Sequence, residues 1–303
     1  MAVSGPSGIG SRPPNAGWKE RNSGKHFSRL EAHLIPNPIR KVLSSMRAHR
    51  VRALLMGGQA CVFYGAAEFS RDTDFVILAD AANLARLRRA LAELQAEPIA
   101  VPPFEIKFLR RGHALHFRCQ HPEALRLRVD VMSKMRGVDS FAKLWRRRTV
   151  IELPDGTKCD LLSLPDLVQA KKTQRDKDWP MIRRLVEAHY FQHSARPASA
   201  PLKFWLRELR TPQLILDLAQ SHPQLCHQLT PARRLLAHAA AGKPAQLERA
   251  LLVEENAVRR ADKQYWLPLR RELEKLRHDL CLSARVRDEN TSFAAKPPGE
   301  ESL

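Results

Sequence analysis

Cysteine is scarce and irregularly placed in this sequence. The 303 residues include only five cysteines, at positions 61, 119, 159, 226 and 281, and no two of them form a C-x-x-C pair. An odd number of scattered cysteines argues against a disulfide framework and against a structural zinc site. We therefore expect reduced thiols and a cytoplasmic protein.

Long apolar segments are also missing. No apolar run reaches the length of about 20 residues that a membrane-spanning helix needs. The N-terminal segment MAVSGPSGIGSRPPNAG is rich in Gly, Pro and Ser and contains no apolar core of the kind that a secretory signal carries. The sequence therefore predicts no signal peptide and no membrane partner.

Acidic residues are few relative to basic ones. The chain has 51 Lys and Arg against 32 Asp and Glu, which gives a formal net charge of +19. A net positive charge of this size attracts polyanions and raises the rate at which the protein encounters nucleic acid. A solvated basic surface without a nucleic-acid partner explains the same composition, so charge alone leaves both interpretations open.

The order of the predicted elements divides the chain into five parts. A disordered tail, 1–35, precedes a domain over 36–193, in which helices and strands alternate before a group of strands. A Pro/Ser/Ala-rich linker, 194–201, leads to a helical domain over 202–282, and 283–303 is a second disordered tail. The predicted fold class is α+β, with a mixed sheet flanked by helices and followed by a helical C-terminal region.

Periodicity and turn residues predict several individual elements. A helix is expected over 81–95, because its leucines form one apolar stripe. The segments 104–110 and 113–119 are predicted to be two strands of a hairpin, and 125–133 a strand with alternating apolar residues. A further hairpin is expected over 149–163, around a Pro-Asp-Gly turn.

Two glycines and two aspartates stand at the ends of consecutive predicted strands. Gly57 and Gly58 allow a ligand to approach the backbone and leave N–H groups free for an anion, although such turns often need glycine for steric reasons alone. Asp72 and Asp74 share a face in an extended chain, and their charges repel unless a cation lies between them. Mg²⁺ prefers this setting of one or two carboxylates plus phosphate oxygens, whereas the alternative is a pair of solvated acids beside Arg71.

Asp130 is an acid inside an apolar alternating strand. It shares a face with Arg126 and Arg128 and could be paired with them at the surface. If its strand lies beside the strand of Asp72 and Asp74, three carboxylates converge next to the glycine turn. That arrangement is typical of two-metal nucleotidyl transfer.

The pattern GG…SRDTDFVI, followed by an acid on a later strand, resembles the signature of the nucleotidyltransferase superfamily, whose fold is similar to that of DNA polymerase beta. Gly57 and Gly58 match its glycine turn, Asp72 and Asp74 its D-x-D, and Asp130 its third acid. The resemblance implies that the three aspartates are catalytic and hold Mg²⁺, and that the glycines contact an NTP. Gly58 stands where many relatives have Ser.

A second block, LLSLPDLVQAKKTQRDKDWPMIRRLVE over 161–187, is similar to the helical block of AbiE-type nucleotidyltransferase-like toxins. The resemblance implies that Lys171, Arg175 and Lys177 lie at the nucleotide phosphates, and that Asp178 caps a helix or pairs with a cation. It also implies a toxin of a toxin–antitoxin or phage-defence system, with an antitoxin protein as a partner.

The predicted function is a Mg²⁺-dependent transfer of a nucleoside monophosphate from an NTP to a hydroxyl group. The basic surface favours RNA, including tRNA, as the acceptor and disfavours a cationic antibiotic, while a protein hydroxyl stays open. The alternative is a catalytically inactive protein of the same fold that binds nucleotide or nucleic acid.

Two further groups of residues have a functional and a structural interpretation. Trp145 beside the arginines 146–148 suits RNA through stacking and phosphate contacts, but a core tryptophan next to a solvated helix end fits equally well. His189 and His193 lie four residues apart on a predicted helix and could bind one metal. No third ligand is evident, so we expect them to be surface histidines.

Overall fold

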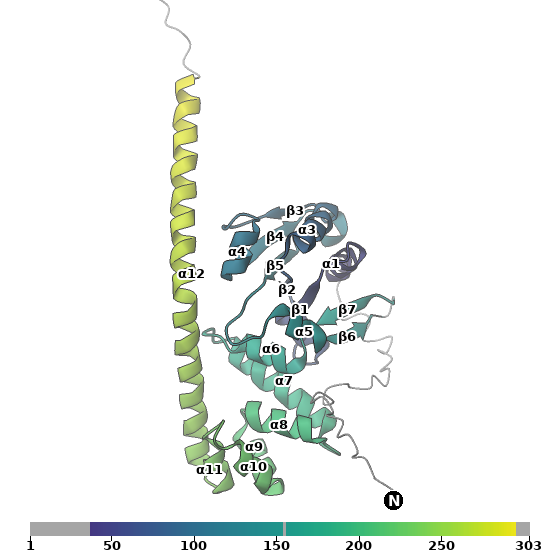
Figure 1. Cartoon of the computed structure of the whole chain (residues 1–303), viewed down its shortest axis with the longest axis vertical. Helices are drawn as coiled ribbons and strands as arrows, with labels where there is room; N and C mark the ends of the chain where they lie inside the picture. Colours follow the sequence, from purple (N-terminus) through teal and green to yellow (C-terminus); the bar gives the residue numbers. More distant parts are fainter. Residues whose placement is uncertain (1–36, 154–155, 295–303) are drawn as a thin grey trace, which may run out of the picture.

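The structure, a computed structural model, describes residues 37–153 and 156–294. The predicted tail 1–35 and the first two residues of the predicted Pro-Asp-Gly turn therefore lie outside the described residues. The expected fold class is confirmed: a seven-stranded mixed sheet has helices around it and is followed by a helical C-terminal region (Figure 1).

The sheet and its flanking helices are formed by residues 37–193. Along the chain these elements are α1 (Asn37–Ala48), β1 (Ala53–Met56), α2 (Gly57–Phe63), β2 (Asp72–Ile77), α3 (Ala81–Glu93), β3 (Ala96–Pro98), α4 (Ile106–Arg111), β4 (Leu115–Cys119), a 3₁₀ turn (Pro122–Ala124), β5 (Arg128–Met132), α5 (Phe141–Arg146), β6 (Thr149–Glu152), β7 (Lys158–Leu161), α6 (Leu164–Lys171) and α7 (Asp178–His193).

The order of the strands places β2 at the centre of the sheet. The order is β3-β4-β5-β2-β1-β7-β6, with β2 antiparallel to β1 and parallel to β5. The apolar residues of β2 and β5 that face one side, including Phe75, Val129 and Val131, are buried in the core. Because side chains alternate along a strand, the polar residues between them face the other side.

Two predicted elements have the expected form. In α3, Leu84, Leu87 and Leu91 are buried as the apolar stripe required, and Asp80 caps the helix by accepting a hydrogen bond from the backbone N–H of Asn83 at 2.6 Å. The strands β6 and β7 pair antiparallel, which confirms the predicted hairpin over 149–163.

The prediction of a strand over 104–110 is wrong, because this segment contains the short helix α4. Phe108 and Leu109 are adjacent in the sequence and both are buried. A strand would send two adjacent side chains to opposite faces, whereas one side of a helix can bury both. Gly112 ends the helix with a left-handed φ of 114°, and only the second expected strand, β4, forms.

The predicted strand over 125–133 forms only in its second part. Leu125 is 56% exposed, and Arg126 has a positive φ of 63°, so the chain turns before β5 begins at Arg128. The alternating sequence pattern therefore begins three residues before the strand that pairs in the sheet.

The C-terminal region is helical from Ser199 onward. It contains α8 (Ser199–Glu208), α9 (Pro212–Ser221), α10 (Pro223–Leu229), α11 (Leu236–Ala240) and α12 (Pro244–Ala294). Because a proline is tolerated in a first turn, Pro201 does not prevent α8 from taking up the end of the predicted linker, 194–201. The segment Ser283–Ala294 has neither Gly nor Pro, and α12 continues through it, so the predicted tail 283–303 is helical in that part.

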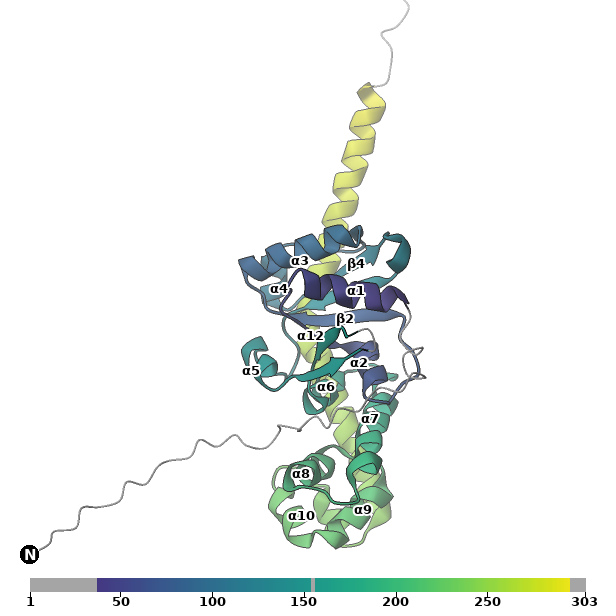
Figure 2. The ribbon, with the colours of Figure 1, turned by 90° about the vertical axis from the view of Figure 1, so that its right-hand side faces the viewer.

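Helix α7 connects the sheet-containing part to the helical region, and α12 returns along both. The helices α8 to α11 gather at the end of the molecule away from the sheet, and the long α12 runs beside them and then past the sheet (Figures 1 and 2). Trp205 of α8 is fully buried and donates its indole N–H to His189 of α7 at 2.9 Å. Arg233 ties α12 to the end of α8 by binding Glu254 and the carbonyl oxygen of Leu209.

Candidate active site

The three predicted catalytic aspartates lie on one face of two neighbouring strands. In the parallel pair β2 and β5, Asp74 is the register partner of Asp130, and Asp72 is the partner of Arg128. Asp72 and Asp74 are two residues apart, so all of these side chains share one face of the sheet. The structure thus brings together the acids that the sequence separates by more than fifty positions.

Asp74 carries a charge that no neighbouring group neutralises directly. Within the described residues, its carboxylate has no hydrogen bond or ion pair, and the same holds for the carboxylate of Asp72. Burial, followed by the nearby charge of Asp130, raises the pKa of Asp74 to about 6. The charge of Lys171 lowers that pKa, but it does not outweigh the other two causes.

The glycine turn lies directly against Asp74. Gly57 has a φ of 69°, and a Cβ atom built on it would lie 1.8 Å from Asp74 Oδ2. The position therefore needs glycine both for its left-handed backbone and for the close approach of the carboxylate. A Cβ atom on Gly58 would lie 2.6 Å from the hydroxyl oxygen of Ser70, so Ser70 places a hydroxyl group next to the glycine turn.

Asp130 differs from the other two aspartates because it has partners. Arg128 Nε donates to Asp130 Oδ1 at 2.8 Å, and His116 Nδ1 lies 2.8 Å from the same oxygen. Burial raises the pKa of Asp130, but the hydrogen bonds from His116 and Arg128 outweigh burial and hold the pKa below its ordinary value. The surface pairing with arginine that the sequence left open is therefore observed for Arg128.

The predicted phosphate-binding cations surround another carboxylate. Lys171 Nζ lies 3.3 Å from Asp178 Oδ1, and Arg175 Nε donates to Asp178 Oδ2 at 2.7 Å. Thr173 Oγ1 donates to the same oxygen at 2.5 Å. Asp178 is thus a salt-bridge partner, and its position at the start of α7 also favours a negative charge. Lys177 is exposed.

Lys171 links these two groups of carboxylates. Its charge lowers the pKa of both Asp74 and Asp178, so it lies within electrostatic reach of both. Arg175 acts on the same two carboxylates, although its side chain is 56% exposed. Both cations therefore act electrostatically on Asp74, and their positive charge would attract a negatively charged ligand to this part of the molecule.

The donor set suits a hard divalent cation at Asp72 and Asp74. Among the residues that the structure describes, neither carboxylate has a protein partner, and carboxylate oxygens are ligands that Mg²⁺ prefers. A preformed set of three or more His, Cys, Asp or Glu ligands is not found in the described part of the chain. For Asp130 to act as a third ligand, its oxygen would have to exchange Arg128 and His116 for the cation.

The tryptophan beside the arginines has a structural role. Trp145 is half-buried, stacks on Phe141, and lies under the guanidinium of Arg148, with 4.2 Å between the guanidinium carbon and the ring centroid. Arg148 also pairs with Asp160 at 2.6 Å. Arg147 donates two hydrogen bonds to the carboxylate of Asp166, at 2.7 and 2.6 Å. These two arginines are thus held by protein carboxylates.

The expectation that His189 is a surface residue is wrong. His189 is buried, accepts the indole N–H of Trp205, and stacks on His193. Burial lowers the pKa of His189 to about 4, so the imidazole is neutral at ordinary pH. The helix that carries it joins the two parts of the molecule, and its buried face extends further than the sequence pattern indicated.

The contacts of two residues at this site, His116 and Ser70, were not predicted from the sequence. His116 reaches Asp130 because β4 pairs antiparallel with β5 and sets these two residues opposite each other. Ser70 reaches Gly58 through the loop before β2. Both contacts depend on strand register or loop path, and the only sequence signal was that His116 falls on the polar face of an alternating segment.

In the described part of the chain, no helix combines the length and the apolar character that crossing a membrane requires. No protein-family model matches this sequence, and no curated protein is significantly similar to it.

Proposed function

We propose that this chain is a Mg²⁺-dependent nucleotidyltransferase, which moves a nucleoside monophosphate from an NTP to a hydroxyl acceptor. The observation that supports the proposal most directly is the pair Asp72 and Asp74. In the described part of the chain both carboxylates lack protein partners, and Asp74 lies against a glycine turn, with Lys171 and Arg175 within electrostatic reach of it. A buried or half-buried charge without a partner is costly, and such groups gather at functional sites.

The proposed roles follow from the position of each group. Asp72 and Asp74 would hold the metal ion, with Asp130 as the third carboxylate. When bound, Mg²⁺ lowers the pKa of an attacking hydroxyl and neutralises the triphosphate. The N–H groups of the turn at Gly57 and Gly58 and the charges of the two cations would bind the phosphates, because fixed donors and cations stabilise concentrated negative charge.

For the acceptor we propose RNA, with tRNA as one class. The net charge of +19 supports a polyanionic acceptor, because it raises the local concentration of RNA near the site. The pairing of Arg147 and Arg148 with protein carboxylates removes two of the residues that first suggested RNA stacking. The proposal for RNA therefore depends on overall charge, and a protein hydroxyl is the competing acceptor. Toxin activity with an antitoxin partner is a further part of this proposal.

A catalytically inactive protein that binds nucleotide is the second candidate, and one observation favours it. Arg128 already forms an ion pair with Asp130, His116 lies at hydrogen-bond distance from it, and Lys171 and Arg175 are already paired with Asp178. If these pairs persist when a nucleotide is present, the site can attract phosphates but cannot complete the set of three carboxylates.

The experiment is incorporation of labelled NTPs into total RNA and into total protein, with and without Mg²⁺. Wild-type protein should label one of the two acceptor pools. The double variant Asp72→Ala/Asp74→Ala should lose labelling by about 1,000-fold, which corresponds to ~4 kcal/mol of transition-state stabilisation. The control Asp217→Ala/Glu274→Ala removes two acids from helices distant in sequence and should label like wild type. Equal labelling by both double variants would contradict the proposal, and binding of NTP without labelling would support the inactive candidate.

A further inference from the structure

The loop between α6 and α7 carries Arg175 and directly follows Lys171, the two cations of the candidate site. It spans 172–177, with Lys171 at the end of α6 before it and Asp178 at the start of α7 after it. Within the loop, Thr173 and Arg175 bind the Asp178 carboxylate, which also pairs with Lys171. Contacts that fix the loop backbone therefore bear on the position of this cluster.

Helix α12 holds the loop through one buried carboxylate. The side chain of Asp262 is only 3% exposed, and its Oδ2 accepts the backbone N–H of Gln174 at 2.9 Å. Its Oδ1 accepts Arg136 Nε at 3.1 Å and Trp266 Nε1 at 3.0 Å. A charge buried this deeply requires such a complete set of donors, and one of them is the loop itself.

Two arginines also bind the backbone of this loop. Arg136, fixed by Asp262, donates through Nη2 to the carbonyl oxygen of Lys172 at 2.8 Å. Arg259, one turn before Asp262 on α12, donates to the carbonyl oxygen of Gln174 at 3.3 Å and forms an ion pair with Asp176. Three backbone groups of the loop are thus bound by α12 or by a residue that α12 fixes.

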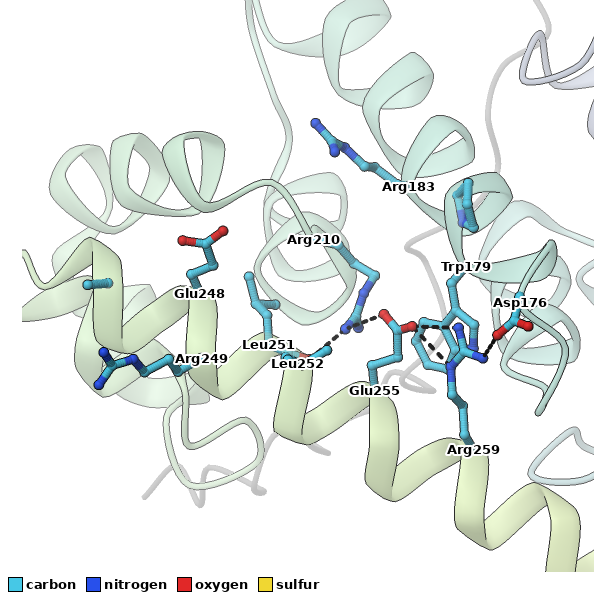
Figure 3. Close-up of a pocket in the computed structure, with 12 residues that line it drawn as sticks. Asp176, Trp179, Arg183, Arg210, Glu248, Arg249, Leu251, Leu252, Glu255 and Arg259 are labelled. Carbon is cyan, nitrogen blue, oxygen red and sulfur yellow. Dashed lines mark hydrogen bonds and ion pairs between the residues drawn. The ribbon is translucent and has the colours of Figure 1, made fainter.

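Trp179 contacts both the loop 172–177 and the C-terminal helical region. Trp179 donates its indole N–H to the carbonyl oxygen of Thr173 at 2.9 Å. Its ring lies under the guanidinium carbons of Arg210 at 4.6 Å and Arg259 at 5.6 Å, and Figure 3 shows Arg259 reaching from α12 toward Trp179 and Asp176. These residues line a groove of about 790 Å³ between α7 and the first turns of α12 (Figure 3).

We propose that α12 positions the phosphate-binding cations, and that Asp262 is the positioning residue through which it acts. Asp262 binds the backbone of the loop at Gln174, while Asp178 pairs with Lys171 before the loop and with Arg175 within it. The helical C-terminal region then contributes to the candidate site without touching the ligand, across a separation of 88 residues between Gln174 and Asp262. The inference rests on the proposed function only for the nature of the ligand, a triphosphate group.

The test compares two attachment points of the same helix. Asp262→Asn keeps the shape of the side chain but removes its charge, and Arg259→Gln is a milder variant at a less buried position. The matched control is Glu272→Gln, because Glu272 attaches α12 to His113 at 2.9 Å and to Arg111, both outside the loop. All variants are full-length chains, and urea unfolding confirms that each is folded before the two measurements below.

The first measurement is amide hydrogen exchange of the peptide covering 172–177, without ligand. It should become about 10-fold faster in Asp262→Asn, intermediate in Arg259→Gln and unchanged in Glu272→Gln. The second is the affinity for inorganic triphosphate by calorimetry, whose dissociation constant should rise about 10-fold in Asp262→Asn and stay unchanged in Glu272→Gln.

The outcomes separate this inference from the proposed function. Unchanged exchange of the loop in Asp262→Asn, or an equal increase in Glu272→Gln, would overturn the inference. Faster exchange with unchanged triphosphate affinity would also overturn it, because the loop would then not position the cations. If wild-type protein binds no triphosphate, the proposed function fails, and the exchange result alone decides whether α12 fixes the loop.

Discussion

Two carboxylates at the candidate site, Asp74 and Asp178, are both within electrostatic reach of Lys171 and have opposite environments. Asp178 is buried and accepts hydrogen bonds from Thr173 and Arg175 as well as the ion pair with Lys171. Burial raises its pKa, but these partners outweigh burial and hold the pKa below the ordinary value. Asp74 has no such partner in the described part of the chain, and its pKa is raised.

The difference separates a structural carboxylate from a candidate functional one. The charge of Asp178 is satisfied within the protein, so the residue can orient the cations and needs nothing from outside. The charge of Asp74 is left without a protein donor beside two other carboxylates, which is unfavourable unless a cation arrives. We therefore expect that removing the charge of Asp178 lowers the stability of the fold, whereas removing the charge of Asp74 impairs only the function.

The largest effect on stability is expected for Asp178→Ala. This change leaves Lys171 and Arg175 without their partner, and breaking a buried ion pair by removing one member costs about 3–5 kcal/mol. Urea unfolding should show the loss as a lower midpoint. The control is Asp176→Ala in the same loop, because Asp176 is 98% exposed and its pair with Arg259 should contribute less than about 1 kcal/mol. Equal losses in the two variants would contradict the structural role of Asp178.

The next effect is expected for Gly57→Ala. The left-handed backbone costs an alanine about 1–2 kcal/mol, and its Cβ atom would also have to displace the carboxylate of Asp74. The matched control is Gly242→Ala, where φ is 64° but no atom lies within 4 Å of a new Cβ atom. Unfolding experiments should therefore show a larger loss for Gly57→Ala by about 1–3 kcal/mol. Identical losses would mean that Asp74 does not lie against the turn.

A smaller effect of opposite sign is expected for Asp74→Asn without divalent cations. At pH 8 the variant should be more stable than wild type by up to about 3 kcal/mol, because it no longer carries an unpaired charge. The folded-state pKa of about 6 lies above the ordinary 3.8, so folded protein holds a proton that the unfolded chain has already released. The free energy of unfolding of wild type should thus fall as the pH rises from 3.8 to about 6. This dependence on pH should be weaker in Asp74→Asn.

Asp178 should respond to pH in the other direction. Its folded-state pKa is lowered, so its contribution to stability is present above its ordinary pKa of 3.8 and is lost as pH falls further. Urea unfolding between pH 3 and pH 8 measures both effects. A pH slope in Asp74→Asn equal to that of wild type between pH 4 and pH 6 would contradict the assigned environment of Asp74.

The smallest effect is expected for Arg128→Gln. The change leaves His116 as a partner of Asp130, so stability should change by no more than about 1 kcal/mol. Because Arg128 no longer competes for the carboxylate, the affinity for Mn²⁺ should rise several-fold, as seen by calorimetry. Arg118→Gln, the register neighbour of Arg128 on β4, is the control and should not change the affinity. A lower affinity in Arg128→Gln would show that this arginine supports the metal site.

The sequence predicted the parts of the fold that depend on local patterns. The apolar stripe of 81–95 and the glycines that separate β1 from β2 are local signals, and they led to the correct elements. The alternation around Phe108 was misleading, because a short helix buries adjacent residues that a strand cannot bury together. Local patterns therefore predicted the elements best where the period continued over several turns.

What could not be predicted from local patterns depends on contacts between distant segments. That Asp74 and Asp130 are neighbours was expected only from the family resemblance, because it follows from the register of two strands. The partnership of His116 with Asp130 follows from the register of a third strand and was not predicted. The attachment of the loop at Gln174 to Asp262 needs the path of α12, which no periodicity reveals. Sequence can identify a carboxylate, whereas only the fold shows whether its charge already has a partner.

We propose that Asp72 and Asp74 are free to receive a divalent cation, and electron paramagnetic resonance of Mn²⁺ tests this most directly. Titration of the wild-type chain should show bound Mn²⁺, and Asp72→Asn/Asp74→Asn should abolish that binding while Asp217→Asn/Glu274→Gln retains it. Binding of Mn²⁺ by the Asp72→Asn/Asp74→Asn chain with the affinity of wild type, or no binding by wild type even with ATP present, would contradict the account.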